Sequence, residues 1–148
     1  MNFNTFWTNL QALEKTIAIT APVAKTVKVA YWGAPPQTLN DLPCIINAMA
    51  EPERTLGFGS REQRLRINVQ LMVEKATVED QRNSLIATAV WFAAKDVFDR
   101  DTTIGGAVSF STLRGADPTV PVILTHAGIA YFGFNAYLDI MDFRGFTF

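Results

Sequence analysis

Two residue types that build many catalytic and metal sites are almost missing from this sequence, whose 148 residues include one cysteine, Cys44, and one histidine, His126. A single cysteine excludes an intramolecular disulfide bond. One cysteine and one histidine are too few for a structural zinc site, so we expect no metal and no other cofactor. Composition allows a Cys44–His126 pair, but Cys44 follows Pro43 in an apolar stretch that suits a buried side chain better than a reactive thiolate. We therefore expect no enzyme activity.

A surplus of positive charge and a long apolar run are also absent. Thirteen basic side chains stand against fourteen acidic ones, and the net charge of −1 provides no basic excess for binding DNA phosphates. No apolar run approaches the ~18 residues that span a bilayer. No basic residue precedes Lys15, although a secretory signal begins with positive charge. We expect neither a membrane protein nor a secreted one, and the single cysteine fits a particle assembled in the cytoplasm.

Apolar residues are abundant instead. They make up 49% of the chain against 18% charged residues, and eleven residues are phenylalanine. A chain of this length is expected to form a single domain over residues 1–148 with one core. Because the interior of a small domain holds few rings, some of the aromatic side chains should lie at the surface, where apolar patches mark interfaces. The composition therefore favours a protein that associates with itself.

The clearest local signal is a strict alternation between Arg64 and Val73. Every second residue, beginning at Leu65, is aliphatic, and the residues between them are polar apart from Met72. Side chains on a strand point to opposite faces with a period of two, so we predict a strand with one dry face and one polar face. This pattern is typical of a scaffold built for contact.

Two segments show the three- and four-residue spacing of apolar residues that a helix requires. The first is capped by Asn2 or Asn4 and reaches about Lys15, and we expect its aromatic stripe either to pack on the sheet or to dock onto a neighbouring subunit. The second follows a cap at Thr77 and ends near Phe98 or Asp99.

The remaining predictions are strands at 26–32, 43–49, 107–113 and 129–142, loops at 51–60 and 114–121, and a sharp turn at Gly105-Gly106. Helices and strands in this order predict an α+β fold. We expect a mostly antiparallel β-sheet packed against one long central helix and an N-terminal helix.

Charged and glycine-rich segments offer few ligand sites. Residues 57–61 superficially resemble a phosphate-binding loop, but they lack the third glycine of a dinucleotide turn, the lysine of a P-loop and a following helix. Arg61, Arg64 and Arg66 give one basic edge that is too small to act alone as a nucleic-acid site. This edge is either a solvated strand face, paired with Glu62 or Glu74, or a charged contact with the acids of another subunit.

The distinctive segments, in order, are the N-terminal helix, the strand Arg61–Leu71, the helix Val78–Phe98, the glycine turn Thr103–Val108 and the closing strand Ile129–Asp142. This order resembles the small tail-terminator, or tail-completion, proteins of long-tailed bacteriophages. The resemblance rests on architecture and size, and it is best over residues 41–143.

The resemblance implies a structural role without catalytic residues. Such proteins form a closed homo-oligomeric ring, usually a hexamer, that caps the finished tail-tube protein polymer and presents it to the head–tail connector or stopper protein. DNA passes through the lumen without sequence-specific contacts. The implied location is the tail or neck of the virion, after assembly in the host cytoplasm.

A ring needs head-to-tail contacts between subunits. If the resemblance holds, we expect these contacts to come from the basic edge, the two loops and the phenylalanine-rich tail. The candidate interface residues are Arg61, Arg64, Arg66, Phe58, Arg114, Phe143, Phe146 and Phe148.

Two other functions remain open at this point. A different neck or tube component, such as a head-completion or stopper protein or a tail-tube subunit, would share these features, although a tube subunit would stack into long polymers. A small-ligand-binding α+β domain would instead need a discrete pocket with perturbed titratable groups, lined by Trp91, Phe132 and Phe134.

Overall fold

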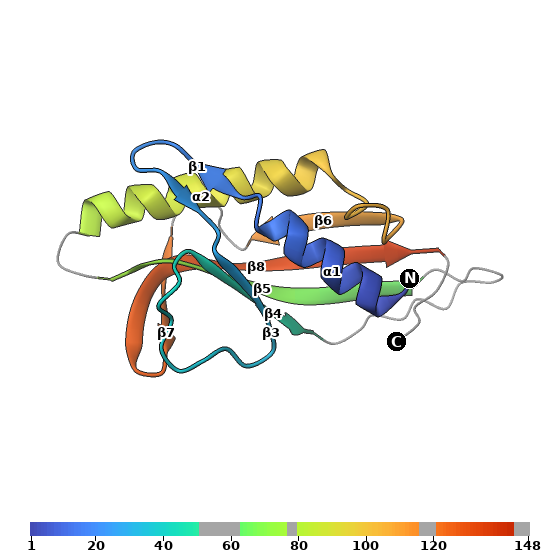
Figure 1. Ribbon diagram of the computed structural model, residues 1–148, viewed down its shortest axis with the longest axis horizontal. Coiled ribbons are helices and arrows are strands. Elements are labelled where there is room, and N and C mark those ends of the chain that lie inside the picture. The colour runs from blue at the N-terminus through green and yellow to red at the C-terminus, as the bar shows by residue number, and fades with distance from the viewer. Residues whose placement is uncertain (51–62, 77–79, 116–120, 144–148) are drawn as a thin grey trace.

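The computed structural model describes residues 1–50, 63–76, 80–115 and 121–143, which form an α+β fold (Figure 1). In chain order the elements are α1 (Phe3–Glu14), β1 (Ala18–Ile19), β2 (Lys25–Thr26), β3 (Val29–Trp32), β4 (Cys44–Met49), β5 (Gln63–Lys75), α2 (Asp80–Arg100), β6 (Phe110–Gly115), β7 (Val122–His126) and β8 (Ile129–Asp142). The six-stranded main sheet has the order β3-β4-β5-β8-β6, and β7 also pairs with β8. Among the described residues, every pairing in this sheet is antiparallel except that of β3 with β4. The predicted α+β class with a mostly antiparallel sheet is confirmed.

The two longest strands, β5 and β8, form the middle of the main sheet. They have 13 and 14 residues and pair with one another along most of their length. On its other side, β8 pairs with β7 along its N-terminal half and with β6 along its C-terminal half. As the alternation predicted, the aliphatic side chains of β5 between Leu65 and Val73 are buried on one face of the sheet.

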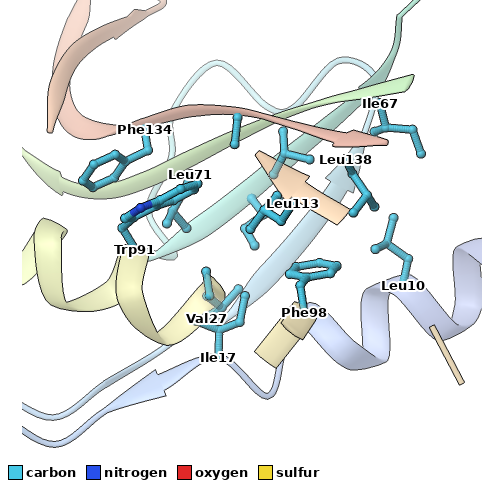
Figure 2. Close-up of a cluster of buried hydrophobic side chains, with 14 of the residues drawn as sticks. Leu10, Ile17, Val27, Ile67, Leu71, Trp91, Phe98, Leu113, Phe134 and Leu138 are labelled. Atoms are coloured by element: carbon cyan, nitrogen blue, oxygen red, sulfur yellow. The ribbon is translucent and has the colours of Figure 1, made fainter. Parts of the chain in front are cut away.

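Both helices and the β1–β2 hairpin cover the same face of the main sheet (Figure 1). The main core lies between these two layers, and each large side chain that it buries stabilises the fold by about 1.5–3 kcal/mol. Figure 2 shows side chains from both layers meeting there: Leu10, Ile17, Val27, Ile67, Leu71, Trp91, Phe98, Leu113, Phe134 and Leu138.

Helix α1 begins at the predicted cap. The Oδ1 of Asn2 accepts a hydrogen bond from the backbone N–H of Thr5 at 3.2 Å, which satisfies one of the free donors in the first turn. The side chains of Phe6 and Leu10 are fully buried in the core of their own chain. Of the two expectations for this helix, packing on its own sheet is therefore the observed one.

The helical layer differs from the predicted single long central helix. Helix α2 has 21 residues and shares the covered face with α1, which has 12, and with the β1–β2 hairpin. It ends at Arg100, next to the predicted end at Phe98 or Asp99, and Arg100 Nη2 lies 2.8 Å from Asp96 Oδ2 one turn earlier. The predicted cap, Thr77, lies outside the described residues. Within the described ranges, neither helix combines the length and the hydropathy needed to cross a membrane.

The predicted glycine turn is present and is longer than expected. Gly105 and Gly106 have φ angles of +63° and +82°, a conformation that side chains disfavour. The backbone N–H of Gly105 donates to the carboxylate of Asp101 at 2.9 Å, which ties the turn to the end of α2. Because the turn uses the following residues as well, β6 begins at Phe110 and not at residue 107 as predicted.

Two strand predictions need correction. The predicted strand at 26–32 is divided, because Val27 turns into the core and leaves β2 paired with β1 while β3 joins the main sheet. Strand β7 was not predicted at all. It forms a hairpin with β8 through Ala127 and Gly128, whose φ angles of +50° and +81° are typical of a two-residue hairpin turn. Its alternation is weak because it exposes both Val122 and Ile123.

The opposite face of the sheet is covered at one end only. A second apolar cluster lies there, made of Leu39, Cys44, Ile46, Met72, Leu124 and Tyr131. Leu39 comes from the segment between β3 and β4. Met72 and Tyr131 occupy positions on the predicted polar face, and their burial corrects that prediction. In the described part of the chain, no helix or strand lies over the rest of this face, where the candidate site is found.

Candidate functional site

The uncovered part of the main sheet, which we call the open sheet face, is made by outward side chains of β5, β8 and β6. It contains a hollow of about 200 Å³. The residues that line the hollow are Arg64, Leu65, Arg66, Phe110, Thr112, Arg114, Asp139, Ile140 and Met141. Tyr137 belongs to the same face, because it is opposite Arg114 in the β6–β8 register. The open sheet face comprises these residues together with Tyr137, except Leu65 and Ile140, whose side chains are buried in the main core.

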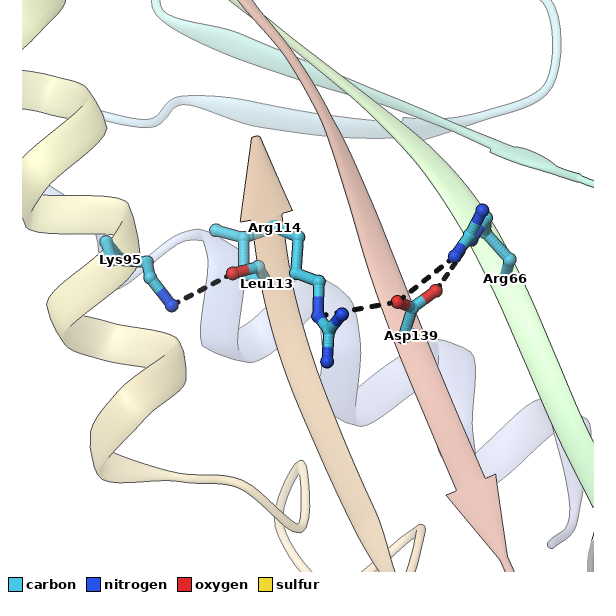
Figure 3. A network of polar contacts seen from close by, with 5 residues as sticks. All are labelled: Arg66, Lys95, Leu113, Arg114 and Asp139. Atoms are coloured by element: carbon cyan, nitrogen blue, oxygen red, sulfur yellow. Dashed lines mark hydrogen bonds and ion pairs between the residues drawn. The ribbon is translucent and has the colours of Figure 1, made fainter. Parts of the chain in front are cut away.

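Asp139 of β8 holds arginines from the strands on both of its sides (Figure 3). Arg66 of β5 donates from Nε to Oδ1 at 2.7 Å and from Nη2 to Oδ2 at 3.4 Å. Arg114 of β6 places its Nε 3.6 Å from Oδ2. Two-point pairing fixes the plane of a guanidinium group, so Asp139 positions Arg66 on this surface.

Aromatic side chains surround these charges. The Cζ of Arg66 lies 5.2 Å from the centre of the Tyr137 ring, a cation–π distance. Tyr137 is 41% exposed and Phe110, on the neighbouring strand, is 47% exposed. Both rings therefore present apolar surface to solvent beside the arginines. The open sheet face is amphipathic, with charged and apolar groups in contact.

The electrostatics of the hollow follow from its composition. Three guanidinium groups and one carboxylate line it among the described residues. An arginine presents planar donors that match a carboxylate or phosphate, and it also stacks on rings. This combination is suited to a macromolecular partner that offers acidic and apolar groups together.

No protein-family model matches the sequence, and no curated protein shows significant similarity to it.

The structure brings three of the predicted interface residues together. Arg64, Arg66 and Arg114 line one hollow, although Arg114 lies in β6 and not in the predicted loop. Phe143 follows β8 and is exposed, and its backbone N–H donates to Ser109 Oγ at 3.2 Å. The other predicted residues, Phe58, Arg61, Phe146 and Phe148, lie outside the described residues, as does the 57–61 segment.

The partner of the basic edge is Asp139, which the sequence did not indicate. Of the two acids proposed for this role, Glu74 instead accepts from Lys25 Nζ at 2.7 Å, and Glu62 lies outside the described residues. In the sequence of β8, Tyr137 and Asp139 alternate with the apolar residues Ala136, Leu138 and Ile140, which places them on the opposite face of the strand. The position of Asp139 opposite Arg66, 73 residues earlier in the chain, depends on the register between β5 and β8, which no local pattern reveals.

Cys44 and His126, the two residues considered for catalysis, lie on different strands and are not paired with one another. Cys44 is fully buried, and burial, with a smaller contribution from the negative charge of Asp41, raises the pKa of its thiol to about 12. His126 Nε2 lies 2.8 Å from the carbonyl oxygen of Pro36. Strands β5 and β8 separate Cys44 on β4 from His126 on β7. Among the described residues, no three acidic, histidine or cysteine side chains are grouped to hold a metal ion.

The aromatic residues expected to line a ligand pocket fill the core instead. The rings of Trp91 and Phe134 stack on one another (Figure 2), and their centroids lie 5.1 Å apart. Phe132 is also buried in the main core. The hollow of the open sheet face lies on the other side of the sheet, so these three side chains do not form the predicted pocket there.

A buried acid on the covered side was not found from sequence. Glu14 of α1 is fully buried, and its Oε2 accepts a hydrogen bond from Asn47 Nδ2 at 2.9 Å. Glu14 Oε1 and Asn47 Oδ1 have no hydrogen-bond partner within the described ranges. Burial raises the pKa of Glu14 from 4.5 to about 8, with the Asn47 hydrogen bond acting weakly in the opposite direction. Glu14 is therefore protonated at neutral pH.

Proposed function

We propose that this chain is a structural protein of a bacteriophage virion. In this proposal it forms a closed homo-oligomeric ring, usually a hexamer, that caps the tail tube, stops its polymerisation and joins the tail to the head connector. The ring assembles in the host cytoplasm and becomes part of the tail or neck. Its partners are the tail-tube protein, the connector or stopper protein and DNA that crosses the lumen.

The observation that carries this proposal is the open sheet face. A ring subunit must present surfaces that are exposed in the isolated chain and become buried against neighbours. Tyrosine, phenylalanine and arginine are the residues that protein–protein interfaces enrich. Phe110, Tyr137 and Arg114 place all three types on one uncovered surface of the main sheet.

The surroundings of the reactive side chains favour a structural role over a catalytic one. The Cys44 thiol has a pKa raised by burial and is shielded from solvent, so it is a poor nucleophile at neutral pH. His126 is engaged with a backbone carbonyl. The net charge of −1 agrees with a ring that lets DNA pass without holding it tightly.

Negative-stain electron microscopy of the purified protein, with light-scattering mass measured over a concentration series, tests this proposal. We expect closed rings of uniform size with a central hole wide enough for duplex DNA. Long stacked tubes would contradict a terminator and indicate a tail-tube subunit. A strict monomer at every concentration would contradict self-assembly and would favour the small-ligand-binding alternative, which a ligand screen would then examine.

A further inference from the structure

Helix α2 carries a second uncovered surface on the side away from the sheet. Leu85 and Phe92 are seven residues apart, so they lie on one side of the helix, and they are 58% and 56% exposed. Their neighbours Ile86 and Trp91 are buried in the core on the opposite side of the helix. Two large apolar side chains therefore project from the centre of the solvent-facing side.

Acidic side chains continue this surface toward the end of the helix. Asp96 follows Phe92 by one turn, and Asp99 lies one further turn along. Both carboxylates are more than half exposed and pair within the helix, Asp96 with Arg100 at 2.8 Å and Asp99 with Lys95 at 3.1 Å. Exposed pairs at this spacing are weak, so these carboxylates can exchange them for partners on another molecule. We call Leu85, Phe92, Asp96 and Asp99 the α2 stripe.

Lys95 is bound to the main sheet of its own molecule as well as to Asp99. Its Nζ donates to the carbonyl oxygen of Leu113 on β6 at 2.9 Å (Figure 3). That contact draws the lysine toward the edge of the sheet. The α2 stripe is therefore apolar at Leu85 and Phe92, and its carboxylates Asp96 and Asp99 become available to a partner that replaces their weak pairs with Arg100 and Lys95.

The open sheet face has the complementary composition. It presents Phe110 and Tyr137 as exposed rings and carries more guanidinium groups than carboxylates. A hollow in that face can receive a side chain such as Phe92, while arginines such as Arg64 and Arg114 meet the carboxylates of the stripe. Apolar groups thus face apolar groups, and acids face bases.

The two surfaces cannot meet within one molecule. The α2 stripe lies on the outside of the helical layer, and the open sheet face lies on the far side of the sheet from that layer (Figure 1). A contact between them joins two copies through different surfaces, and each added copy leaves one surface of each kind free. Such head-to-tail contacts build rings or filaments and not closed dimers.

We propose that the α2 stripe of one subunit docks on the open sheet face of the next subunit in the ring. This inference rests on the proposed function for the existence of a ring, and it identifies the two surfaces that form the subunit contact. Phe92 fills the hollow, and Arg64 and Arg114 bind Asp96 and Asp99 of the neighbour.

Two variants, each lacking one surface, test this contact. Arg64→Glu/Arg114→Glu alters the open sheet face and leaves Arg66 to hold Asp139. Leu85→Gln/Phe92→Gln removes the apolar side chains of the stripe and keeps residues that favour a helix. We expect each variant alone to assemble only at concentrations about a hundredfold or more above the concentration that the wild type needs.

Mixing the two variants is the decisive measurement. Each variant keeps the surface that the other has lost, so the mixture should give a discrete heterodimer by light scattering and native mass spectrometry. No longer species should form, because the heterodimer has used both intact surfaces. Absence of the heterodimer would overturn the proposed contact.

Charge rescue and a matched control complete the experiment. Adding Asp96→Arg/Asp99→Arg to the variant with glutamate at 64 and 114 should restore assembly, because the charges are exchanged and not removed. Lys15→Glu/Lys28→Glu makes the same change in charge at exposed positions outside both surfaces and should assemble like the wild type. Loss of assembly in this control would assign the effect to net charge and overturn the contact.

The state of the wild-type protein separates this inference from the proposed function. Rings that persist in both variants would leave the ring standing and overturn the contact. Open filaments that both variants abolish would support the contact and overturn the closed ring. A wild-type protein that stays monomeric at every concentration would overturn both. Circular dichroism of each variant confirms that the fold is intact.

Discussion

Replacing Glu14 with glutamine should stabilise the folded protein, and the gain should grow as pH rises. Glu14 is fully buried beside Asn47, and its pKa is raised from 4.5 to about 8. Between these two pH values the unfolded chain releases the proton while the folded chain keeps it. Because the folded state binds more protons, the free energy of unfolding falls as pH rises through this window.

The size of the effect follows from the two pKa values. Each pKa unit corresponds to about 1.4 kcal/mol, so Glu14 costs about 3 kcal/mol at about pH 7 and about 5 kcal/mol above pH 8. Below pH 4.5 both the folded and the unfolded state hold the proton, so titration of Glu14 does not reduce the free energy of unfolding there. Glutamine has nearly the shape of the protonated acid and does not titrate. The stability difference between Glu14→Gln and the wild type should therefore be small near pH 4.5 and largest near pH 8.

Urea unfolding followed by circular dichroism at a series of pH values measures this difference. Midpoints and slopes give the free energy of unfolding of both proteins, provided that the slope m is unchanged. Glu74→Gln is a matched control, because it makes the same chemical change in a partly exposed ion pair with Lys25. We expect that control to cost less than about 1 kcal/mol. The same gain for Glu14→Gln at both ends of the window would refute the protonated, buried state of Glu14.

Three further predictions follow from close approaches and backbone geometry. Gly133→Ala should lower stability by about 3 kcal/mol or more, because an added Cβ would collide with the backbone oxygen of Leu71; a wild-type urea midpoint would contradict this. Ala127→Asn should raise stability by up to about 1 kcal/mol, because asparagine before Gly128 suits the positive φ of the hairpin turn. Thermal unfolding measures this change, and a melting temperature that stays the same or falls would contradict it. The Cys44 thiol, buried and with a pKa raised to about 12, should react with a thiol reagent only after unfolding in urea, so rapid reaction of the native protein would show that it is accessible.

The sequence by itself determined the elements whose signals are local. The alternation from Arg64 to Val73 predicted β5 and the face that it buries, because side-chain direction on a strand depends only on position along it. The cap at Asn2 and the apolar spacing after it predicted α1. The paired glycines at 105 and 106 predicted a turn, because glycine adopts positive φ angles more readily than residues with a side chain, and both glycines have positive φ in the structure.

Strand pairing was decided by the tertiary structure. Strand β7 has no clear alternation, since Val122 and Ile123 are both exposed, and it becomes a strand by pairing with the N-terminal half of β8. Met72 and Tyr131 are buried in a cluster that also contains Leu39, from the distant segment between β3 and β4. These outcomes depend on which distant segments meet, and neighbouring residues do not encode that choice.

The candidate site shows the same division. Its ingredients were visible in the sequence, since Arg64, Arg66 and Arg114 were expected at an interface and Asp139 lay on the polar side of the last strand. Their assembly around one hollow was not visible, because the β5–β8 register that sets Arg66 against Asp139 joins residues 73 positions apart. Local periodicity determines which way a side chain points along its own strand. Only the packing of whole strands determines what it meets.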